Sequence, residues 1–336
     1  MSDNNVLLEI KDLRTYFYLD DGVLKAVDGV SFDIRRNSVL GIVGESGCGK
    51  SITARSILRI VPPPGKVEGE ILFHDNGKTV DLAKLPRHGD DIRAIRGRDI
   101  AMIFQEPMSA FSPVHTIGNQ IMEAVLVHEQ VEKAEARGRA VELLRQVGIS
   151  MPESRVDNYP HEMSGGMLQR AMIAMALALR PKILIADEPT TALDVTIQAQ
   201  ILRLMKNLKE DIGMSIIFIT HDLGVIANMA DDVAVMYLGR VVEYGTVRQI
   251  FRNPKHPYTQ ALLKSIPMIG KERGGKLASI EGTVPVPINP PRQCGFADRC
   301  AEFIAGRCDA DVPPLLEVEP GHLVRCVLYE NETEAV

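Results

Sequence analysis

Short runs of apolar residues alternate with longer segments of mixed polarity along the first 250 residues. Four of these runs have the length and composition of strands buried on both faces, as in a parallel sheet. They cover residues 39–43, 100–104, 183–187 and 216–220. Because these runs alternate with segments of helical pattern, the sequence predicts an α/β core.

The other patterned segments predict an antiparallel layer, a hairpin and several helices. Residues 6–18 and 28–34 are predicted to be strands of the antiparallel layer, with residues 71–73 as a third strand. Residues 233–242 are predicted to form a hairpin that turns at Leu238 and Gly239. The predicted helices cover residues 51–58, 117–128, 132–146 and 164–178.

The chain changes character after about residue 250. The run N-P-K-H-P-Y-T from Asn253 to Thr259 interrupts the regular pattern, and residues 283–291 are rich in proline. Such a proline-rich segment predicts an extended linker or strap. We therefore expect a large domain over residues 1–250 and a smaller one over residues 251–336.

Charge and apolar length exclude some classes of protein. The formal net charge of the 336 residues is −6, so we expect no nucleic-acid partner. The longest wholly apolar stretch, residues 171–179, is far shorter than the roughly 20 residues that span a bilayer. The polar start, residues 1–5, does not resemble a signal peptide. We expect a cytosolic protein that reaches a membrane only through partners.

A phosphate-binding loop follows the first predicted core strand. The sequence fits G-x-x-x-x-G-K-[ST] at every fixed position, between a strand and a helix. Its glycines let successive backbone N–H groups face a phosphate at a helix N-terminus. Lys50 is expected to contact the β- and γ-phosphates, and Ser51 to bind Mg²⁺. The expected nucleotide-binding residues are Gly44, Glu45, Ser46, Gly47, Cys48, Gly49, Lys50 and Ser51.

Two further motifs add catalytic groups. Asp187 and Glu188 end an apolar strand, where Asp187 is expected to help hold Mg²⁺ and Glu188 to act as the general base. Ser164 is predicted to cap a helix whose N-terminus, with Gly165 and Gly166, forms a second anion site. One nucleotide cannot easily occupy both phosphate-binding helix starts of the same subunit.

The order of these motifs resembles that of ABC-type ATPases over about residues 6–250. The series is the phosphate loop, Gln105, Ser164-Gly165-Gly166, Asp187-Glu188, Ala192-Leu193-Asp194 and His221. The resemblance implies a P-loop NTPase fold with a RecA-like parallel-sheet core, an antiparallel β layer and a helical subdomain over about residues 106–180. It also implies that Ser164, Gly165 and Gly166 of one subunit cover the ATP held by another.

The resemblance implies roles for four more residues. Gln105 resembles the glutamine that senses Mg²⁺ and the attacking water, and Asp194 the aspartate that communicates across the dimer. His221 resembles the histidine that contacts the γ-phosphate. Phe17 aligns best with the aromatic residue that stacks on adenine, although the neighbouring Tyr16 and Tyr18 stay open as alternatives.

Two features narrow the resemblance to importers. Met163 and Met167 stand where the usual LSGGQ signature has Leu and Gln, and a methionine in place of the glutamine is familiar in peptide-importer ATPases. The run from Asn253 to Thr259 resembles the start of the extension in oligopeptide and dipeptide importer ATPases. This implies a translocase ATPase at the cytoplasmic face of the membrane. The implied partners are a second, homologous ATPase subunit forming a heterodimer, two transmembrane permeases and an extracytoplasmic substrate-binding protein. Import of nickel, glutathione or oligosaccharides, or a non-transport role in DNA repair or translation, stays open.

Four of the five cysteines lie in the extension with the spacing C-x5-C-x7-C-x17-C, at Cys294, Cys300, Cys308 and Cys326. In a cytosolic chain such clustering favours a metal site over disulfides, and the spacing does not match the usual zinc pairs. Four thiolates can ligate an iron–sulfur cluster, and the resemblance implies a [4Fe–4S] cluster here. Zinc, free thiols or disulfides are the alternatives.

The fifth cysteine, Cys48, lies in the phosphate loop. A thiol at a helix N-terminus can have a lowered pKa. We expect alkylation of Cys48 to inactivate the protein and bound ATP to protect it, although a small residue merely tolerated between two glycines is the simpler interpretation.

Overall fold

The computed structural model describes residues 5–190, 194–265, 280 and 282–330. Residues 1–4 of the polar start, and Ala192 and Leu193, lie outside these ranges. The chain forms two compact units. Unit 1 comprises residues 1–35, 39–84 and 220–336, and unit 2 comprises residues 36–38 and 85–219. None of the helices in the described ranges is long and apolar enough to cross a membrane.

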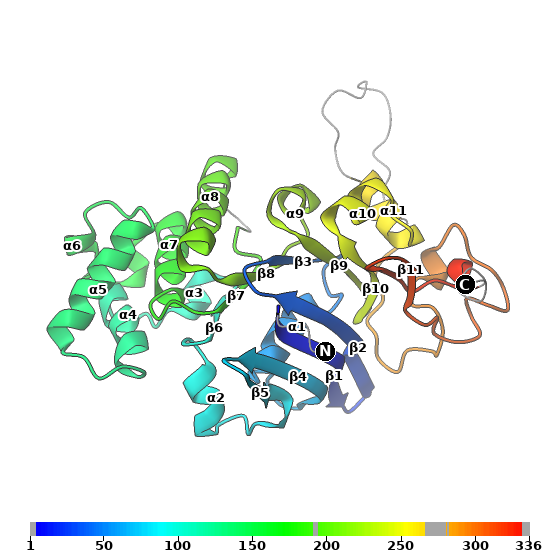
Figure 1. Cartoon of the computed structure of the whole chain (residues 1–336), viewed down its shortest axis with the longest axis horizontal. Helices are drawn as coiled ribbons and strands as arrows, with labels where there is room; N and C mark the ends of the chain where they lie inside the picture. Colours follow the sequence, from blue (N-terminus) through cyan, green and yellow to red (C-terminus); the bar gives the residue numbers. More distant parts are fainter. Residues whose placement is uncertain (1–4, 191–193, 266–279, 281, 331–336) are drawn as a thin grey trace. The chain divides into compact units, whose positions relative to one another are not determined.

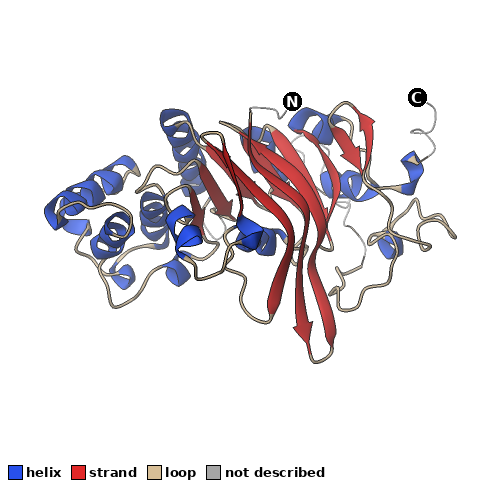
Figure 2. Cartoon of the chain, turned by 60° about the horizontal axis from the view of Figure 1, so that its bottom comes forward, coloured by secondary structure: helices blue, strands red, loops and turns tan. Residues whose placement is uncertain are grey.

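An antiparallel sheet of order β2-β1-β4-β5 forms one layer of unit 1. Its strands, red arrows in Figure 2, are β1 Val6–Leu19, β2 Gly22–Arg35, β4 Gly65–Asp75 and β5 Lys78–Asp81. The three predicted strands are confirmed. However, β2 begins six residues earlier than predicted, because its backbone pairing with β1 continues to the turn, where Leu19 pairs with Gly22. The short strand β5 was not predicted.

Unit 1 also contains strands in the order β11-β12-β10-β9-β3. They are β3 Val39–Val43, β9 Asp232–Tyr237, β10 Arg240–Thr246, β11 Leu316–Glu319 and β12 His322–Val324. Strands β3 and β9 are parallel, and β9 and β10 form the predicted hairpin. Leu238 and Gly239 both have positive φ, 44° and 76°, as the tight primed turns of hairpins require. The extension thus adds β12 and β11 beside β10.

The helices of unit 1 include four α-helices and three 3₁₀ turns within the described ranges. They are α1 Lys50–Ile57, η1 Leu82–Lys84, α9 Leu223–Met229, α10 Val247–Arg252, α11 Pro257–Lys264, η3 Ala297–Arg299 and η4 Val327–Tyr329. The proline-rich segment is an extended strap, as predicted. It lies along β2, where the Lys25 N–H donates to the Pro287 carbonyl and the Asn289 N–H donates to the Val23 carbonyl.

Unit 2 is built on the parallel strands β8-β7-β6. Their bounds are β6 Ile100–Ile103, β7 Ile183–Asp187 and β8 Ser215–Ile219. Every residue of β7 and β8 is buried, as the apolar runs predicted. Strand β8 lies one residue earlier than predicted.

The helices of unit 2 follow the predicted pattern over residues 106–180, where Figure 1 shows α4, α5, α6 and α7 gathered together. They are α2 Asp90–Ile95, α3 Pro107–Ala110, α4 Ile117–Leu126, α5 Lys133–Gln146, α6 Pro152–Arg155, η2 Pro160–Glu162, α7 Gly165–Ala176 and α8 Val195–Ile212. Helix α8 was not predicted.

A buried carboxylate joins the extension to the rest of unit 1. Glu243 on β10 is fully buried, and its oxygens accept the N–H groups of Lys255 and His256 at 2.8 and 2.9 Å. One of these oxygens also lies 2.8 Å from Nε2 of His322 on β12. The Nδ1 atom of His256 accepts the N–H of Tyr258 at 3.0 Å and so caps α11. This cap requires an unprotonated His256 nitrogen.

Burial lowers the pKa of His256 from 6.5 to about 4. The unfolded chain therefore binds a proton at this position more readily between these two pH values. The contribution of neutral His256 to stability is complete above pH 6.5 and is lost as the pH falls toward 4, by at most about 3 kcal/mol. Between pH 7.5 and 4.5, denaturant melts should show a smaller loss of unfolding free energy for His256→Asn than for the wild type. Asparagine retains a capping side chain but has no imidazole to protonate. The control His88→Asn alters an exposed histidine and should follow the wild type; parallel pH dependence of wild type and His256→Asn would contradict the assignment.

Candidate functional site

The phosphate loop of unit 1 runs from β3 into α1 along a path that excludes side chains at two glycines. Gly44 and Gly49 have φ of 153° and 102°, a range that favours glycine. A Cβ atom at Gly44 would lie 2.2 Å from the Met236 carbonyl oxygen, and one at Gly49 would lie 2.2 Å from that of Ala26. The tip of the loop, Ser46 and Gly47, is exposed. This geometry is that of a phosphate-binding loop.

Lys50, the first residue of α1, points back into the loop. Its side chain is only 5% exposed, and Nζ donates to the carbonyl oxygens of Gly44 and Glu45 at 2.8 and 3.1 Å. The ammonium group is thus held inside the loop, where phosphate oxygens can replace the carbonyl partners. Ser51 follows it on α1 and is half-buried.

Glu45 is held by two residues that the sequence analysis did not assign to the site. Its N–H donates to the hydroxyl oxygen of Tyr258 at 2.9 Å. Its carboxylate accepts hydrogen bonds from both terminal nitrogens of Arg299, at 2.8 and 3.1 Å. The only sequence signals for these residues are the N-P-K-H-P-Y-T run, which contains Tyr258, and the position of Arg299 directly before Cys300.

The expectation of a lowered pKa at Cys48 is wrong. Cys48 is fully buried, and this burial raises the pKa of its thiol. The neighbouring Lys50, whose Nζ lies 3.8 Å from the sulfur, opposes the effect only in part. A helix N-terminus therefore does not make this thiol reactive, because desolvation of the thiolate outweighs the nearby positive charge.

In unit 2, the structure brings Gln105 and Glu188 together. Glu188 directly follows β7, with a positive φ of 47°, and its N–H donates to the Ile219 carbonyl at 2.9 Å. Its carboxylate accepts a hydrogen bond from Nε2 of Gln105 at 3.1 Å. Asp187, the last residue of β7, is 2% exposed. A half-buried carboxylate in a strained conformation beside an exposed amide is typical of a catalytic group.

The motif at Ser164 begins α7 as predicted. The Ser164 hydroxyl accepts the Met167 N–H at 3.4 Å. A Cβ atom on Gly165 would meet nothing within 4 Å in the part of the chain that the structure describes. The described residues of this chain therefore give no steric reason for glycine at position 165. A Cβ on Gly166 would lie 3.4 Å from Ile197, an ordinary contact.

The other predicted residues lie at element ends. Asp194 caps α8 by accepting the N–H groups of Thr196 and Ile197 at 3.0 and 2.9 Å. His221 belongs to unit 1, is exposed and directly precedes Asp222, the N-cap of α9.

The three aromatic candidates for adenine stacking lie near the end of β1. Alternation along the strand places Tyr16 and Tyr18 on one face and Phe17 on the other. The Tyr16 hydroxyl donates to Asp28, and the Lys66 ammonium lies 4.9 Å from the ring of Tyr18. Phe17 packs instead against Gly65, where a Cβ would lie 2.8 Å from its ring.

The four cysteines of the extension share one small region. Cys308 packs with Ala297 and Val327 in a buried cluster, against which Cys294 also packs. Burial raises the pKa of Cys294, Cys300 and Cys326, that of Cys326 to about 11, and neighbouring thiols raise these values further.

One of the four sulfurs accepts a hydrogen bond from a backbone N–H group, and backbone N–H groups also affect the pKa of the other three cysteines. The Ile304 N–H donates to Cys308 Sγ at 3.4 Å. The N–H groups of Phe296, Glu302 and Leu328 oppose part of the burial effect on the pKa of the cysteine two residues before each. No group of three or more His, Cys, Asp or Glu side chains in the described ranges is arranged to hold a single metal ion.

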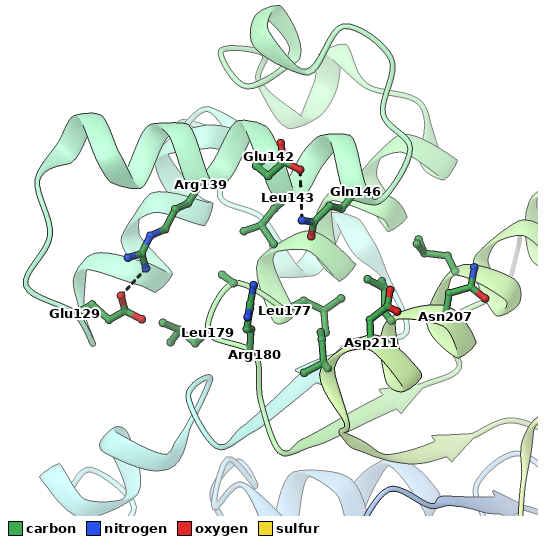
Figure 3. A pocket seen from close by; sticks show the side chains of 14 residues that line it. Glu129, Arg139, Glu142, Leu143, Gln146, Leu177, Leu179, Arg180, Asn207 and Asp211 are labelled. Carbon is green, nitrogen blue, oxygen red and sulfur yellow. Dashed lines mark hydrogen bonds and ion pairs between the residues drawn. The ribbon is translucent and has the colours of Figure 1, made fainter.

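A cavity of about 820 Å³ lies within unit 2 (Figure 3). Its walls come from α5, the chain that follows α7, and α8, and include Arg139, Arg180 and Asp211. Arg139 is already paired with Glu129, as Figure 3 shows. None of the predicted site residues is among the residues that line this cavity.

Two family models match the chain: "ABC transporter" matches residues 27–191, and "Oligopeptide/dipeptide transporter, C-terminal region" matches residues 242–308. A probable peptide ABC transporter ATP-binding protein of Sinorhizobium fredii is 52% identical over 324 residues, covering 96% of this chain and 95% of the relative. The oligopeptide transport ATP-binding protein AppD of Bacillus subtilis is 50% identical over 330 residues, covering 98% of both chains. Among solved structures, a dimeric ATP-binding cassette in a post-hydrolysis state with ADP and Pi has a TM-score of 0.63 and 27% identity. The likeness covers 72% of this chain and 99% of the cassette.

The burial of Cys48 leads to a prediction about its reactivity. Brief treatment of the native full chain with iodoacetamide at pH 7.5 should leave Cys48 unmodified, because the thiol is buried and its pKa is raised. Denatured protein provides the control in which Cys48 must react, and peptide mass mapping measures both. Modification of native Cys48 as fast as in denatured protein would contradict the assignment.

Proposed function

This chain belongs to the ABC transporter ATP-binding proteins of the oligopeptide and dipeptide type, and from that premise we propose that it hydrolyses ATP to drive the import of di- and oligopeptides across a membrane. Its fold is that of an ATP-binding cassette, as the sequence predicted. The phosphate loop holds ATP, and Glu188 activates the water that attacks the γ-phosphate.

The match of residues 242–308 to the peptide-transporter C-terminal region carries this proposal. An ordinary cassette accounts for 72% of this chain, so the extension is what distinguishes it. Relatives named for oligopeptide and dipeptide transport match it along 98% of its length. These matches favour peptides over nickel, glutathione or oligosaccharides, and transport over roles in DNA repair or translation.

The site residues divide by task. Backbone N–H groups of the loop and the Lys50 ammonium bind the phosphates, while Ser51, Gln105 and Asp187 supply oxygen atoms suited to Mg²⁺. Magnesium, when bound, neutralises charge that develops on the phosphates. Gln105, hydrogen-bonded to Glu188, orients the base and the attacking water. His221 contacts the γ-phosphate, and Phe17 stacks on adenine.

A second subunit completes the site. The exposed Ser164 and Gly165 lie at the start of α7, where a Cβ on Gly165 would meet no described atom of this chain. Glycine at such a position is suited to close approach of a ligand held elsewhere. We therefore assign Ser164, Gly165 and Gly166 to the ATP bound by a homologous partner ATPase, with Asp194 beside that interface.

The remaining partners follow from the import role. Two transmembrane permeases receive the motion of the helical subdomain, about residues 106–180, at the cytoplasmic face of the membrane. An extracytoplasmic binding protein delivers the peptide. Residues 1–250 form the nucleotide-binding domain in this scheme, and residues 251–336 form the peptide-importer extension.

We assign a [4Fe–4S] cluster to Cys294, Cys300, Cys308 and Cys326. Four soft thiol ligands suit such a cluster, whose properties depend on hydrogen bonds to sulfur, and the Ile304 N–H donates to Cys308 Sγ. A single zinc ion needs every ligand sulfur about 2.3 Å from the metal. The described residues contain no group of three or more potential ligands arranged to hold one ion. The cluster is larger than one ion and cross-links the extension when bound.

The role of Glu188 is tested by Glu188→Gln in the assembled transporter. Glutamine preserves the shape of the side chain but cannot accept the proton of water, so ATP hydrolysis should fall by about 10²- to 10⁴-fold while ATP still binds. Phosphate release and fluorescent-nucleotide titration measure the two properties. The control Glu153→Gln alters a surface partner of Arg145 and should keep wild-type turnover. Near-normal turnover by Glu188→Gln would refute its role as the base.

The cluster is tested by purification without oxygen. The protein should be brown and contain iron and acid-labile sulfide, and Cys300→Ser should lose most of both, whereas the control Cys48→Ser should retain them. A colourless protein without iron and sulfide would overturn the assignment, and stoichiometric zinc in its place would support the alternative.

A further inference from the structure

Glu45 connects the phosphate loop to the extension through its backbone N–H and its carboxylate. Its carbonyl oxygen holds the Lys50 ammonium at 3.1 Å. Its N–H is bound by Tyr258, and its carboxylate is bound by Arg299. Both partners come from beyond residue 250, and Arg299 lies 254 residues from Glu45 in sequence. The extension therefore reaches the nucleotide site directly.

Arg299 is fixed in its environment. Its side chain is only 7% exposed, although the carboxylate partner is 26% exposed. The guanidinium also donates to the Tyr237 hydroxyl at 3.2 Å and to the Gly282 carbonyl at 3.3 Å. Its central carbon lies 6.0 Å from the ring of Phe296. A bidentate pair with this much additional support is stronger and more specific than an ordinary surface ion pair.

The aromatic rings beneath this pair fix Tyr258. Tyr258 is fully buried, with its ring centroid 4.7 Å from that of Tyr237 and 5.3 Å from that of Phe296. Tyr237 ends β9, and Phe296 directly precedes the 3₁₀ turn that ends at Arg299. The hydroxyl that binds the Glu45 N–H is therefore positioned by packed rings.

The negative charge of Glu45 links its pairing with Arg299 to nucleotide binding. ATP carries several negative charges, and a carboxylate in the loop that binds it repels those charges at short range. Arg299 neutralises this carboxylate in a bidentate geometry that also directs it to a fixed place. Loss of the arginine would leave an unpaired negative charge on the phosphate loop.

We propose that Arg299 and Tyr258 are positioning residues of the nucleotide site, through which the extension neutralises and orients Glu45 and so sets the affinity for ATP. This inference rests on the proposed function, because it takes the loop around Glu45 to be the ATP site. Neither residue contacts the reacting atoms, so the effect is on nucleotide binding and KM, while kcat at saturating ATP changes little.

The test is fluorescent-ATP titration of the full chain. Arg299→Ala should bind ATP about tenfold more weakly, and the double variant Glu45→Gln with Arg299→Ala should recover most of that loss, because the repelling charge is gone. Tyr258→Phe, which retains the ring, should weaken binding about threefold. The matched control Arg292→Ala removes an arginine of the same extension that pairs instead with Asp311, and should bind ATP as the wild type does.

The outcomes separate this inference from the proposed function. Lys50→Ala must abolish binding; if it does not, the assignment of the ATP site fails. If Lys50→Ala abolishes binding but Arg299→Ala binds ATP normally, the role of Arg299 is wrong. A double variant as weak as Arg299→Ala, with an unchanged circular dichroism spectrum, would also overturn the proposal, because a purely structural arginine is not rescued by removing the charge of Glu45.

Discussion

A phosphate loop has to pass through space that side chains would fill, and the two carbonyl groups that crowd Gly44 and Gly49 impose this path. These carbonyls belong to Met236 on β9 and Ala26 on β2, so strands from both sheets of unit 1 shape the loop. The inward position of Lys50 depends on the same path, since its ammonium bonds to the carbonyl oxygens that the turn directs toward it. Any larger residue at either glycine would displace the loop and the ammonium together.

The extension is part of unit 1, which also contains the phosphate loop. It supplies β11 and β12 beside β10, and Glu243 binds the start of α11 and His322 in a buried polar network. Removing one partner from such a network leaves the others unsatisfied in a buried place, which makes the attachment strong. The same segment then presents Tyr258 and Arg299 to the loop. The extension that these contacts hold in place therefore also carries the residues that bind Glu45 of the loop.

Local rules allowed much of the fold to be predicted. The bounds of β3 and β7 agree with the apolar runs, and Ser164 caps α7 as its side chain and the following glycines indicated. The misses also have physical reasons. Residues 22–27 of β2 lack a clear apolar alternation and are ordered by pairing with β1, and α8 carries only a narrow buried stripe, Ile201 and Met205, among polar residues.

The sequence by itself determined the phosphate loop, the order of the catalytic motifs, the helix caps and the turn at Leu238 and Gly239, because each depends on neighbours within a few residues. Only the tertiary structure decided the raised pKa of Cys48, the hydrogen bond of Gln105 to Glu188 and the ion pair of Arg299 with Glu45. Burial and pairing across 83 or 254 residues set these properties. No local pattern encodes the dielectric surroundings or the distant partner of a side chain, since both arise only when the chain has folded.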